Sequence, residues 1–280
     1  MRQTRFTQAR GFTLIEVIVV IVILGILGIA SFSFLSFGSE IFRDASSRQQ
    51  IIAESRFALD RLAKELKYVV PRSIRVDAAD QNRCIEFVPL VTSSRYLELP
   101  QGGPASPTEF IAIAPQQVSA LSTMFLFVYP TQTAHVYAAS SRRQQIQTAT
   151  ALTGAQSGLM RFTFQGSAPT FSQHSPGRRY FIGAGPVSWC YDDSAQALVR
   201  FTGYNLSATQ PSLTTLTSSA TPREVMLATL INDLASEPWP FTIMPASLRR
   251  NSLVQTDWIV GDRLGEKVQL THEIHLPNVP

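Results

Sequence analysis

The sequence has little charge and no long-range repeat. Of its 280 residues, 16% are Asp, Glu, Lys or Arg, and 45% are hydrophobic. Soluble globular chains average about 25% charged residues, and a chain this apolar is not disordered. It has no Gly-X-Y period, which excludes a collagen-like fold, and only one apolar stretch long enough to cross a bilayer, which excludes a multi-span transporter. The length suits one large domain or two small ones.

Recognisable catalytic and cofactor motifs are also missing. There is no GxSxG, P-loop, HExxH, or GxGxxG following a strand. His272 and His275 are three residues apart in a predicted strand, so their side chains point to opposite faces and do not make a metal pair. Asp192 and Asp193 are more typical of a solvated turn than of a calcium site. We therefore expect no enzyme activity, no cofactor and no metal.

Basic charge is concentrated at the N-terminus. The chain has 24 basic and 20 acidic residues. Arg2, Arg5 and Arg10 lie in residues 1–11, which hold no acid, so 21 basic residues (24 − 3) face 20 acidic ones in the rest of the chain. The later arginines form short, scattered pairs that are more typical of a solvated surface than of a polyanion site, so we expect no nucleic-acid partner. These pairs are Arg72–Arg75, Arg142–Arg143, Arg178–Arg179 and Arg249–Arg250.

The apolar stretch covers residues 12–39 and contains one ionisable residue, Glu16. As a helix it would be about 42 Å long, more than the roughly 30 Å hydrocarbon core of a bilayer. Because arginines precede it and none follows before Arg43, the positive-inside rule predicts that residues 1–11 are cytoplasmic and the rest lies outside. A secretory signal has a shorter apolar core with small residues after it, whereas here Gly11 stands before the core.

The residues Arg10-Gly11-Phe12-Thr13-Leu14-Ile15-Glu16-Val17 resemble the type III signal of type IV prepilins and of type II secretion pseudopilins. The resemblance implies that a prepilin peptidase cleaves between Gly11 and Phe12 and then N-methylates Phe12. It also implies a single-pass inner-membrane protein that is later drawn into a filament. The implied partners are the prepilin peptidase, other minor and major pilins, the inner-membrane pilus assembly platform and the lipid bilayer. A plain signal anchor with an incidental Glu16 is the alternative.

Glu16 has a physical role in this interpretation. Cleavage would leave a cationic amine on Phe12 at the end of an apolar helix, and a charge in a dry core of packed helices needs a partner. Glu16 is the only acid nearby in the sequence. We expect its carboxylate to accept the amine of an adjacent, staggered subunit, which would fix the axial register. Ionisable residues within membrane helices are commonly functional for the same reason.

Apolar residues continue at helical spacing from Ile41 to Val69, and Pro71 ends the pattern, so we expect one helix from Phe12 to about Val69. The remaining sequence predicts an α+β, pilin-like fold in which this helix packs on a mainly antiparallel β-sheet domain. The expected divisions are a cytoplasmic leader (1–11), a transmembrane and assembly helix (12–39), its amphipathic continuation (40–70) and a periplasmic β-rich domain (71–280).

Short β-like runs separated by Pro, Gly, Ser and Thr follow residue 72. The residues 101–108, 140–158 and 206–222 are low in bulky apolar side chains and are expected to be loops, and Glu224–Ser236 is expected to be a strand followed by a loop or short helix. The expected strands are Cys84–Val88, Tyr96–Leu99, Phe110–Ala114, Met124–Tyr129, His135–Ala138, Arg161–Phe164, Tyr180–Gly183, Val187–Tyr191, Leu198–Gly203, Phe241–Met244, Ser252–Val260 and Lys267–Leu276.

The β-rich domain is large for a pilin, as in the largest minor subunits. The runs Cys84–Pro89, Val187–Tyr191 and Leu198–Arg200 are similar to W-type minor pilins and to pseudopilin J, and the tail Val268–Pro280 looks closest to O-type minor pilins of the mannose-sensitive haemagglutinin pilus. The resemblance implies a minor pilin that helps to initiate or cap a type IV pilus. A minor pseudopilin of a type II secretion system is the alternative, and a membrane-anchored periplasmic enzyme is a remote one.

Cys84 and Cys190 are the two cysteines, and their spacing fits neither a CxxC motif nor a zinc site. If the β-rich domain is periplasmic, it lies in a compartment where disulfides persist. We therefore expect a disulfide between them. Two buried, reduced thiols acting as small hydrophobes are the alternative.

Overall fold

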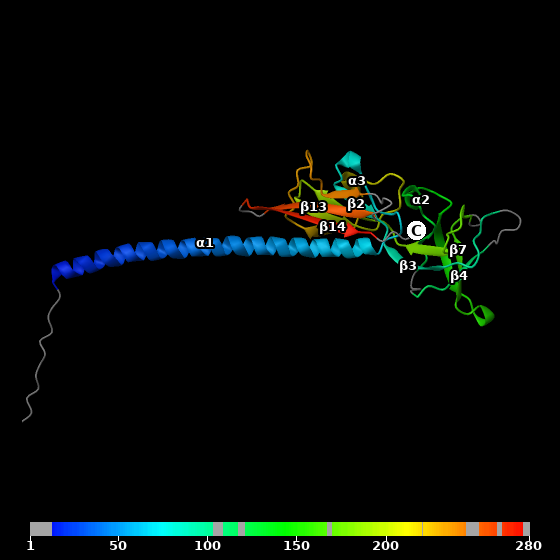
Figure 1. Ribbon diagram of the computed structural model, residues 1–280, viewed down its shortest axis with the longest axis horizontal. Helices are drawn as coiled ribbons and strands as arrows, with labels where there is room; N and C mark the ends of the chain where they lie inside the picture. Colours follow the sequence, from blue (N-terminus) through cyan, green and yellow to red (C-terminus); the bar gives the residue numbers. More distant parts are fainter. Residues whose placement is uncertain are drawn as a thin grey trace, which may run out of the picture. The chain divides into compact units, whose positions relative to one another are not determined.

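The computed structural model describes residues 13–102, 109–116, 121–166, 170–219, 221–244, 252–261 and 265–276. The chain divides into two compact units, residues 1–50 and residues 51–280. The described part of the first unit is helical, and the second unit contains two lobes built on antiparallel sheets (Figure 1).

The helix α1 covers Leu14–Lys67. The sequence has no proline before Pro71, so nothing removes a backbone donor along this stretch. Lys64 and Lys67 lie in the last turn, where cations complement the negative end of the helix dipole. The predicted single long helix is thereby confirmed, while its expected first residue, Phe12, lies outside the described residues.

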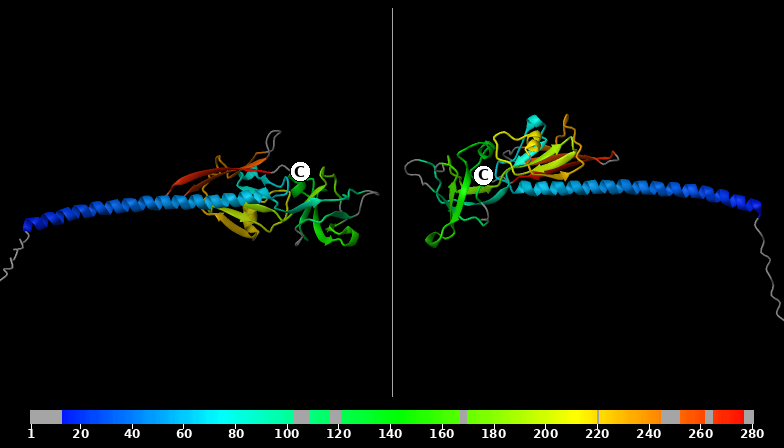
Figure 2. Two further views of the ribbon diagram at one scale, coloured as in Figure 1. Left: turned by 60° about the horizontal axis from the view of Figure 1, so that its bottom comes forward. Right: turned by 180° about the vertical axis from the view of Figure 1, so that it is seen from behind.

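The core lobe, which we define as residues 51–89 and 184–276, contains two antiparallel sheets (Figure 2). The five-stranded sheet has the order β1-β2-β9-β10-β11, and the three-stranded sheet has the order β12-β13-β14. Their strands are β1 (Arg75–Val76), β2 (Cys84–Phe87), β9 (Val187–Asp192), β10 (Ala197–Phe201), β11 (Arg223–Leu227), β12 (Phe241–Met244), β13 (Leu253–Gly261) and β14 (Lys267–His275). Two short helices, η1 (Ala78–Asp80) and α3 (Leu213–Ser218), lie in the connections.

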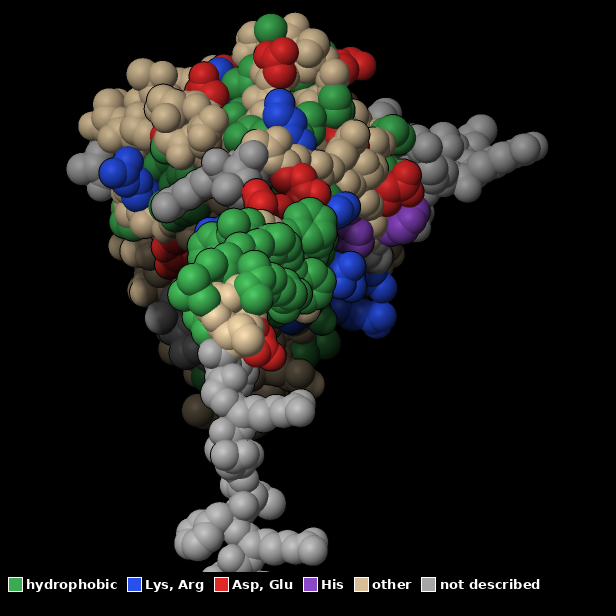
Figure 3. All heavy atoms as spheres, turned by 90° about the vertical axis from the view of Figure 1, so that its left-hand side faces the viewer, with side chains coloured by type: hydrophobic (Ala, Val, Ile, Leu, Met, Phe, Trp, Pro, Cys, Tyr) green, Lys and Arg blue, Asp and Glu red, His purple; other side chains and the backbone are tan. Residues whose placement is uncertain are grey.

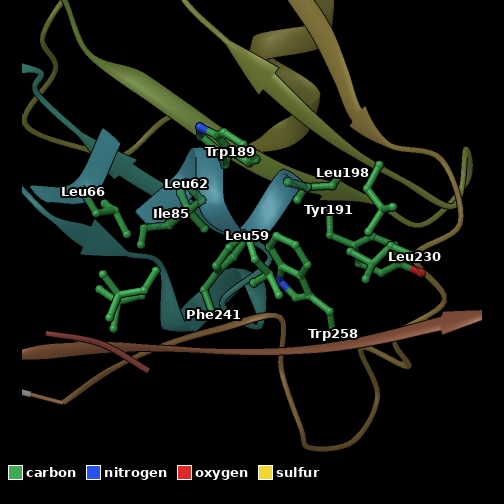
Figure 4. Close-up of a cluster of buried hydrophobic side chains, with 14 of the residues drawn as sticks. Leu59, Leu62, Leu66, Ile85, Trp189, Tyr191, Leu198, Leu230, Phe241 and Trp258 are labelled. Carbon is green, nitrogen blue, oxygen red and sulfur yellow. The ribbon is translucent and has the colours of Figure 1, made fainter. Parts of the chain in front are cut away.

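The second half of α1 completes the core of this lobe. Figure 4 shows Leu59, Leu62 and Leu66 pointing into the same cluster as Trp189 of the five-stranded sheet and Trp258 of the three-stranded sheet. Leu62, Leu66 and both tryptophans are fully buried. Burying one leucine contributes about 1.5–3 kcal/mol, so the helix and the two sheets stabilise one another.

The inserted lobe, residues 90–183, lies between β2 and β9 in the sequence. Its six strands have the order β3-β8-β5-β6-β7-β4, and a bridge between Tyr96 and Ala112 joins the two outer strands, so the sheet closes on itself. Inside, the Phe110 ring meets Phe162 and Tyr180 edge-on. The elements are β3 (Leu90–Arg95), β4 (Phe110–Ile113), β5 (Phe125–Val128), α2 (Ala134–Tyr137), β6 (Arg143–Ala151), η2 (Gly154–Gln156), β7 (Leu159–Phe164) and β8 (Arg179–Gly183).

A third apolar cluster joins the two lobes. Val70 and Val88 of the core lobe pack with Phe127 and Phe181 of the inserted lobe. Gly183 lies at the closest approach, where an added Cβ would be 2.7 Å from the side chains of Val70 and Val88. Only glycine leaves room for this contact without a shift of the neighbouring side chains.

Several local expectations were wrong. His135–Ala138, expected as a strand, overlaps the short helix α2, and Tyr96–Leu99 follows a strand instead of forming one. The expected loop 140–158 contains the nine-residue strand β6, and the expected loop 206–222 contains α3. The two expected loops carry few bulky apolar side chains, so their pairing and packing partners decide their conformation more than their composition does. The remaining strand expectations overlap observed strands.

Candidate functional site

The N-terminal part of α1 presents apolar side chains on all sides. Its large hydrophobic residues from Leu14 to Phe42 are exposed, with fractions between 44% and 81%. Figure 3 shows hydrophobic side chains gathered over this helix. Within the described residues α1 is the one helix long and apolar enough to cross a membrane, with a mean hydropathy of 2.9 over 18 residues. Such a surface needs a bilayer or another protein to cover it.

Glu16 lies in the first turn of α1. Its backbone N–H donates to Thr13 Oγ1 at 3.4 Å, and the N–H of Val17 donates to the Thr13 carbonyl at 3.3 Å, so Thr13 caps the helix. An acid in this turn also complements the positive end of the helix dipole. The Glu16 carboxylate accepts no hydrogen bond from any described group, and the residue is exposed.

Gly11 and Phe12 lie outside the described residues, as do the arginines of residues 1–11. The structure brings Glu16 to the start of the helix, directly after these positions in the sequence. The cleavage, methylation and assembly roles of Gly11, Phe12 and Glu16 therefore stay predictions.

Two glycines, Gly25 and Gly28, lie in the apolar part of α1. An added Cβ at Gly25 or Gly28 would meet no atom within 4 Å. The helix continues unbroken through both positions. Small residues on an apolar helix let another backbone approach closely, so they form a shallow notch that suits helix–helix contact.

The carboxylate of Glu65 holds the second half of α1 to the strands of the core lobe. Glu65 accepts from the Trp189 indole N–H at 3.1 Å and pairs with Arg200 at 3.1 Å. It also pairs with Arg61 one turn earlier, at 3.1 Å, a favourable i,i+4 spacing on a helix. Arg200 and Arg61 in turn approach Glu224 of β11 at 3.6 Å and 3.8 Å. Nothing in the helical pattern distinguishes Glu65 from a solvated acid, because Trp189 and Arg200 are more than a hundred residues away in the sequence.

A second polar cluster lies where the core lobe meets the inserted lobe. Glu86, fully buried on β2, pairs with Arg75 and accepts from the Tyr204 hydroxyl at 3.1 Å. The Arg75 guanidinium lies 3.6 Å from the centre of the Tyr137 ring, which belongs to the inserted lobe. Burial raises the pKa of the Glu86 carboxyl above its usual value, and the Arg75 pairing offsets this in part. Burial likewise raises the pKa values of Tyr137 and Tyr204, with the Glu86 charge adding to both.

Cys84 and Cys190 form a disulfide, as predicted. They are direct partners in the antiparallel pairing of β2 and β9, and their Cα atoms are 4.1 Å apart. The bond joins the two strands between which the inserted lobe begins and ends. It therefore belongs to the framework of the core lobe.

The histidines and acids considered for metal binding are dispersed. In the described residues, no three His, Cys, Asp or Glu side chains are grouped so as to hold a metal ion. His272 and His275 lie on β14 at positions of opposite parity. Asp192 accepts from the Ser194 hydroxyl at 2.6 Å and the Ala195 N–H at 3.2 Å, which stabilises the β9–β10 turn.

Comparison with known proteins finds one family, described as the prokaryotic N-terminal methylation motif, which matches residues 7–32. No curated protein and no solved structure matches the chain. The match covers the residues directly before α1, from residue 7, and the apolar start of the helix as far as residue 32. The chain thus carries a type IV pilin-like signal, which indicates a pilin or pseudopilin processed by a prepilin peptidase, on a pilin-like α+β architecture.

Proposed function

We propose that this chain is a minor pilin of a type IV pilus of the haemagglutinin type, which acts in pilus initiation and assembly at the tip. The observation that carries the proposal is the methylation motif at residues 7–32, which includes the start of a helix whose apolar surface is uncovered. A prepilin peptidase cleaves between Gly11 and Phe12 and methylates the new N-terminus. The helix then leaves the bilayer for the filament, where the helices of neighbouring subunits cover it.

Glu16 is the assembly residue in this proposal. The exposed position of Glu16 in the first turn of α1 supports it, since a carboxylate there can reach the N-terminus of a staggered neighbour. In a dry helix core an unpaired ammonium or carboxylate costs several kcal/mol, so the two charges select the register in which they meet. The notch at Gly25 and Gly28 allows neighbouring helices to approach closely.

The proposed location is the inner membrane, with a single pass, the N-terminus in the cytoplasm and the two lobes in the periplasm. The three leader arginines support this orientation through the positive-inside rule. The disulfide supports an oxidising compartment for the core lobe. The proposed partners are the prepilin peptidase, the other minor and major pilins, the inner-membrane assembly platform and the lipid bilayer.

Intact-mass and N-terminal peptide analysis of membrane-extracted protein tests the proposal. The expected product begins with N-methyl-Phe12, and Gly11→Val abolishes it because the peptidase needs a small residue before the scissile bond. Gly25→Val is the matched control, since an added Cβ there meets no atom within 4 Å. A wild-type chain that begins at Met1, or that is cut beyond residue 30, contradicts the proposal.

A minor pseudopilin of a type II secretion system is the second candidate, because the methylation motif fits both systems. The two differ in the effect of deleting the gene. A minor pilin's loss lowers the number of surface pili and leaves protein secretion unchanged, whereas a pseudopilin's loss stops secretion of the exported substrates. Pilus counts and secreted-protein profiles from one deletion strain separate them.

A further inference from the structure

The outer strands of the sheets differ in how easily another chain could pair with them. The sheet of the inserted lobe closes on itself. In the five-stranded sheet, β1 has two residues, and β11 has a register shift opposite Leu198 and Val199 of β10. In the three-stranded sheet, β12 has four residues, whereas β14 has nine and pairs with β13 without a shift. Short or irregular edges hinder pairing with another chain, so β14 is the edge best suited to it.

The hydrogen bonds of β13 show which backbone groups of β14 face outward. The N–H groups of Asp257 and Gly261 and the carbonyl of Ile259 all bond to residues outside β14. The odd-numbered residues of β13 therefore point away from β14, and the even-numbered ones bond to it. Since even-numbered residues pair with even-numbered ones in this register, the odd-numbered residues of β14 present their N–H and C=O groups outward. They are Lys267, Gln269, Thr271, Glu273 and His275.

These outward backbone groups are unpaired in the described structure. All five residues are exposed. Among the described residues, β13 is the one strand paired with β14, and no other backbone hydrogen bond reaches any of the five. The nine residues of β14 extend over about 30 Å at 3.4 Å per residue. A row of unpaired donors and acceptors of this length is a template for a further strand.

The side chains of β14 add a pattern to this template. Lys267 and Glu273 lie on the outer side of the sheet, and neither forms an ion pair with a described residue. The five residues between them include no Lys, Arg, Asp, Glu or Pro, which are the residues that protect an edge. On the side that faces the core, Val268 and Leu270 are half-buried and continue the apolar cluster to the edge.

We propose that β14 receives an antiparallel strand from a different protein, with a basic residue opposite Glu273 and an acidic residue opposite Lys267. Backbone hydrogen bonds supply the affinity in this mode of recognition, and the side chains supply the specificity. Because the strands run in opposite directions, the basic residue precedes the acidic one by six positions in the partner. The residues between them alternate, with apolar side chains beside Val268 and Leu270 and uncharged polar ones on the outer side.

A second copy of this chain does not suit this edge. Two copies of β14 related by a two-fold axis would match Lys267 with Glu273, but their strands would run in opposite directions. The strand runs along the second half of α1, with which it shares an apolar cluster (Figures 1 and 2). The pairing would therefore reverse one α1 relative to the other, whereas two copies anchored in one bilayer have the same direction. The choice of a different protein thus rests on the proposed function.

Synthetic strands test the edge on the purified full chain in detergent. The charge-matched peptide Lys-Val-Thr-Val-Thr-Val-Glu and the charge-reversed peptide Glu-Val-Thr-Val-Thr-Val-Lys, both with blocked termini and a fluorophore, are titrated by fluorescence anisotropy. The charge-matched peptide should bind about tenfold more tightly, because reversal turns two opposite-charge pairs into two like-charge pairs. Combining Lys267→Glu with Glu273→Lys should invert the preference. A wild-type preference for the charge-reversed peptide overturns the antiparallel arrangement.

A proline at an outward position separates backbone pairing from charge. Gln269→Pro should lower the affinity for the charge-matched peptide at least about tenfold, because it removes an outward donor and places a ring between the strands. The unfolding midpoint should not change, since this N–H does not bond to β13. Gln269→Ala keeps the N–H and is the matched control, with wild-type affinity. Equal affinities of the two peptides in every variant, or no binding of either peptide, overturn the proposal.

A photo-cross-linking residue in place of Gln269 tests the partner in the full chain in membranes. The expected adduct joins a different protein, through a peptide in which a basic residue precedes an acidic one by six positions. Exchanging the charges of Lys267 and Glu273 should lower its yield about tenfold. An adduct between two copies of this chain, or with a peptide that lacks the pattern, overturns the proposal. Mass analysis of the same samples shows whether the N-terminus begins at Phe12. A processed chain without the expected adduct refutes the strand partner alone, whereas a chain that begins at Met1 refutes the proposed function.

Discussion

The two halves of α1 belong to one continuous helix but meet their surroundings in different ways. In the first half, from Leu14 to Phe42, every large hydrophobic side chain is exposed. In the second half, Leu59, Leu62 and Leu66 are buried in the core lobe while the opposite side of the helix faces solvent. The first half has apolar residues all round, and the second has them on one stripe.

This difference separates two sources of stability. The second half is fixed by its own chain, through packing against both sheets and through the contacts of Glu65 with Trp189 and Arg200. Within the described structure, no other part of the chain covers the large hydrophobic side chains of the first half. Its partner must be a bilayer or other subunits, so changes there should affect assembly, and changes in the second half should affect folding.

The largest expected effect is that of Glu16→Ala on assembly. The variant should insert into the membrane as well as the wild type, since removing a carboxylate makes the helix more apolar. Its incorporation into pili should fall by at least about tenfold, because an unpaired buried ammonium costs several kcal/mol. Immunoblots of sheared pili and of membranes measure the two quantities. Glu54→Ala, in the second half of α1, is the control for loss of one acid, and normal pilus levels of the Glu16 variant contradict the pairing.

Replacing a leucine by alanine in each half of α1 tests whether only the second half contributes to folding stability. Leu62→Ala should lower the free energy of unfolding of the core lobe by about 2–5 kcal/mol, the usual range for a fully buried leucine. Leu24→Ala, at a position 61% exposed, should change it by less than about 0.5 kcal/mol. Denaturant titration of the full chain in detergent, followed by tryptophan fluorescence, reports on the core lobe because Trp189 and Trp258 lie in it. Equal effects of the two substitutions would remove the distinction between the halves.

The difference between the two halves of α1 can be predicted from the sequence, whereas the strands and the position of the inserted lobe cannot. An unbroken apolar run and a later 3-4 spacing are local signals, and Gly11, Phe12 and Glu16 have fixed places relative to them. The strand β6 has one buried large side chain, Ile146, among Gln, Thr and Ala, so its sequence is that of a loop until β5 and β7 pair with it. The position of the inserted lobe follows from the pairing of Phe87 with Val187, a contact between residues a hundred positions apart.

Some residues of the candidate site could likewise be identified from the sequence, and others could not. The role of Glu16 follows from a motif, and the disulfide follows from the compartment that the motif implies. Glu65 and Glu86 were not identified, because their partners come from strands and loops distant in sequence. A hydrophobic stripe reveals which side of a helix is buried, but a carboxylate at the margin of that stripe looks the same whether its partner is water or Arg200.

The disulfide lies in the core lobe, which holds the second half of α1. Its removal should therefore affect the stability of this lobe and not the membrane insertion of the first half. Replacing Cys84 and Cys190 together by Ser should lower the free energy of unfolding of the core lobe by about 2–4 kcal/mol, with about 4.7 kcal/mol as the upper figure for a loop near 100 residues. Membrane insertion should not change. Denaturant titration and membrane fractionation measure these, and reduction of the wild-type protein should give a matching loss. An unchanged unfolding midpoint would contradict a stabilising role.

The smallest expected effect is a change in pH dependence at Glu86. Its folded pKa is raised above the usual 4.5, mainly by burial. The folded protein therefore binds more protons than the unfolded chain between pH 4.5 and the folded pKa. The contribution of protonated Glu86 to stability is complete below about pH 4.5 and is lost as the pH rises through the folded pKa.

Glu86→Gln should remove this component. The variant loses its ion pair with Arg75 and should be less stable overall, but its unfolding midpoint should fall less steeply than that of the wild type as the pH rises above 4.5. Thermal unfolding of the full chain in detergent, measured from pH 4 to pH 8, gives both profiles. Glu224→Gln, at a carboxylate with 61% of its side chain exposed, is the matched control. A Glu86→Gln profile parallel to the wild type would show that the carboxyl has the same pKa in the folded and unfolded chains.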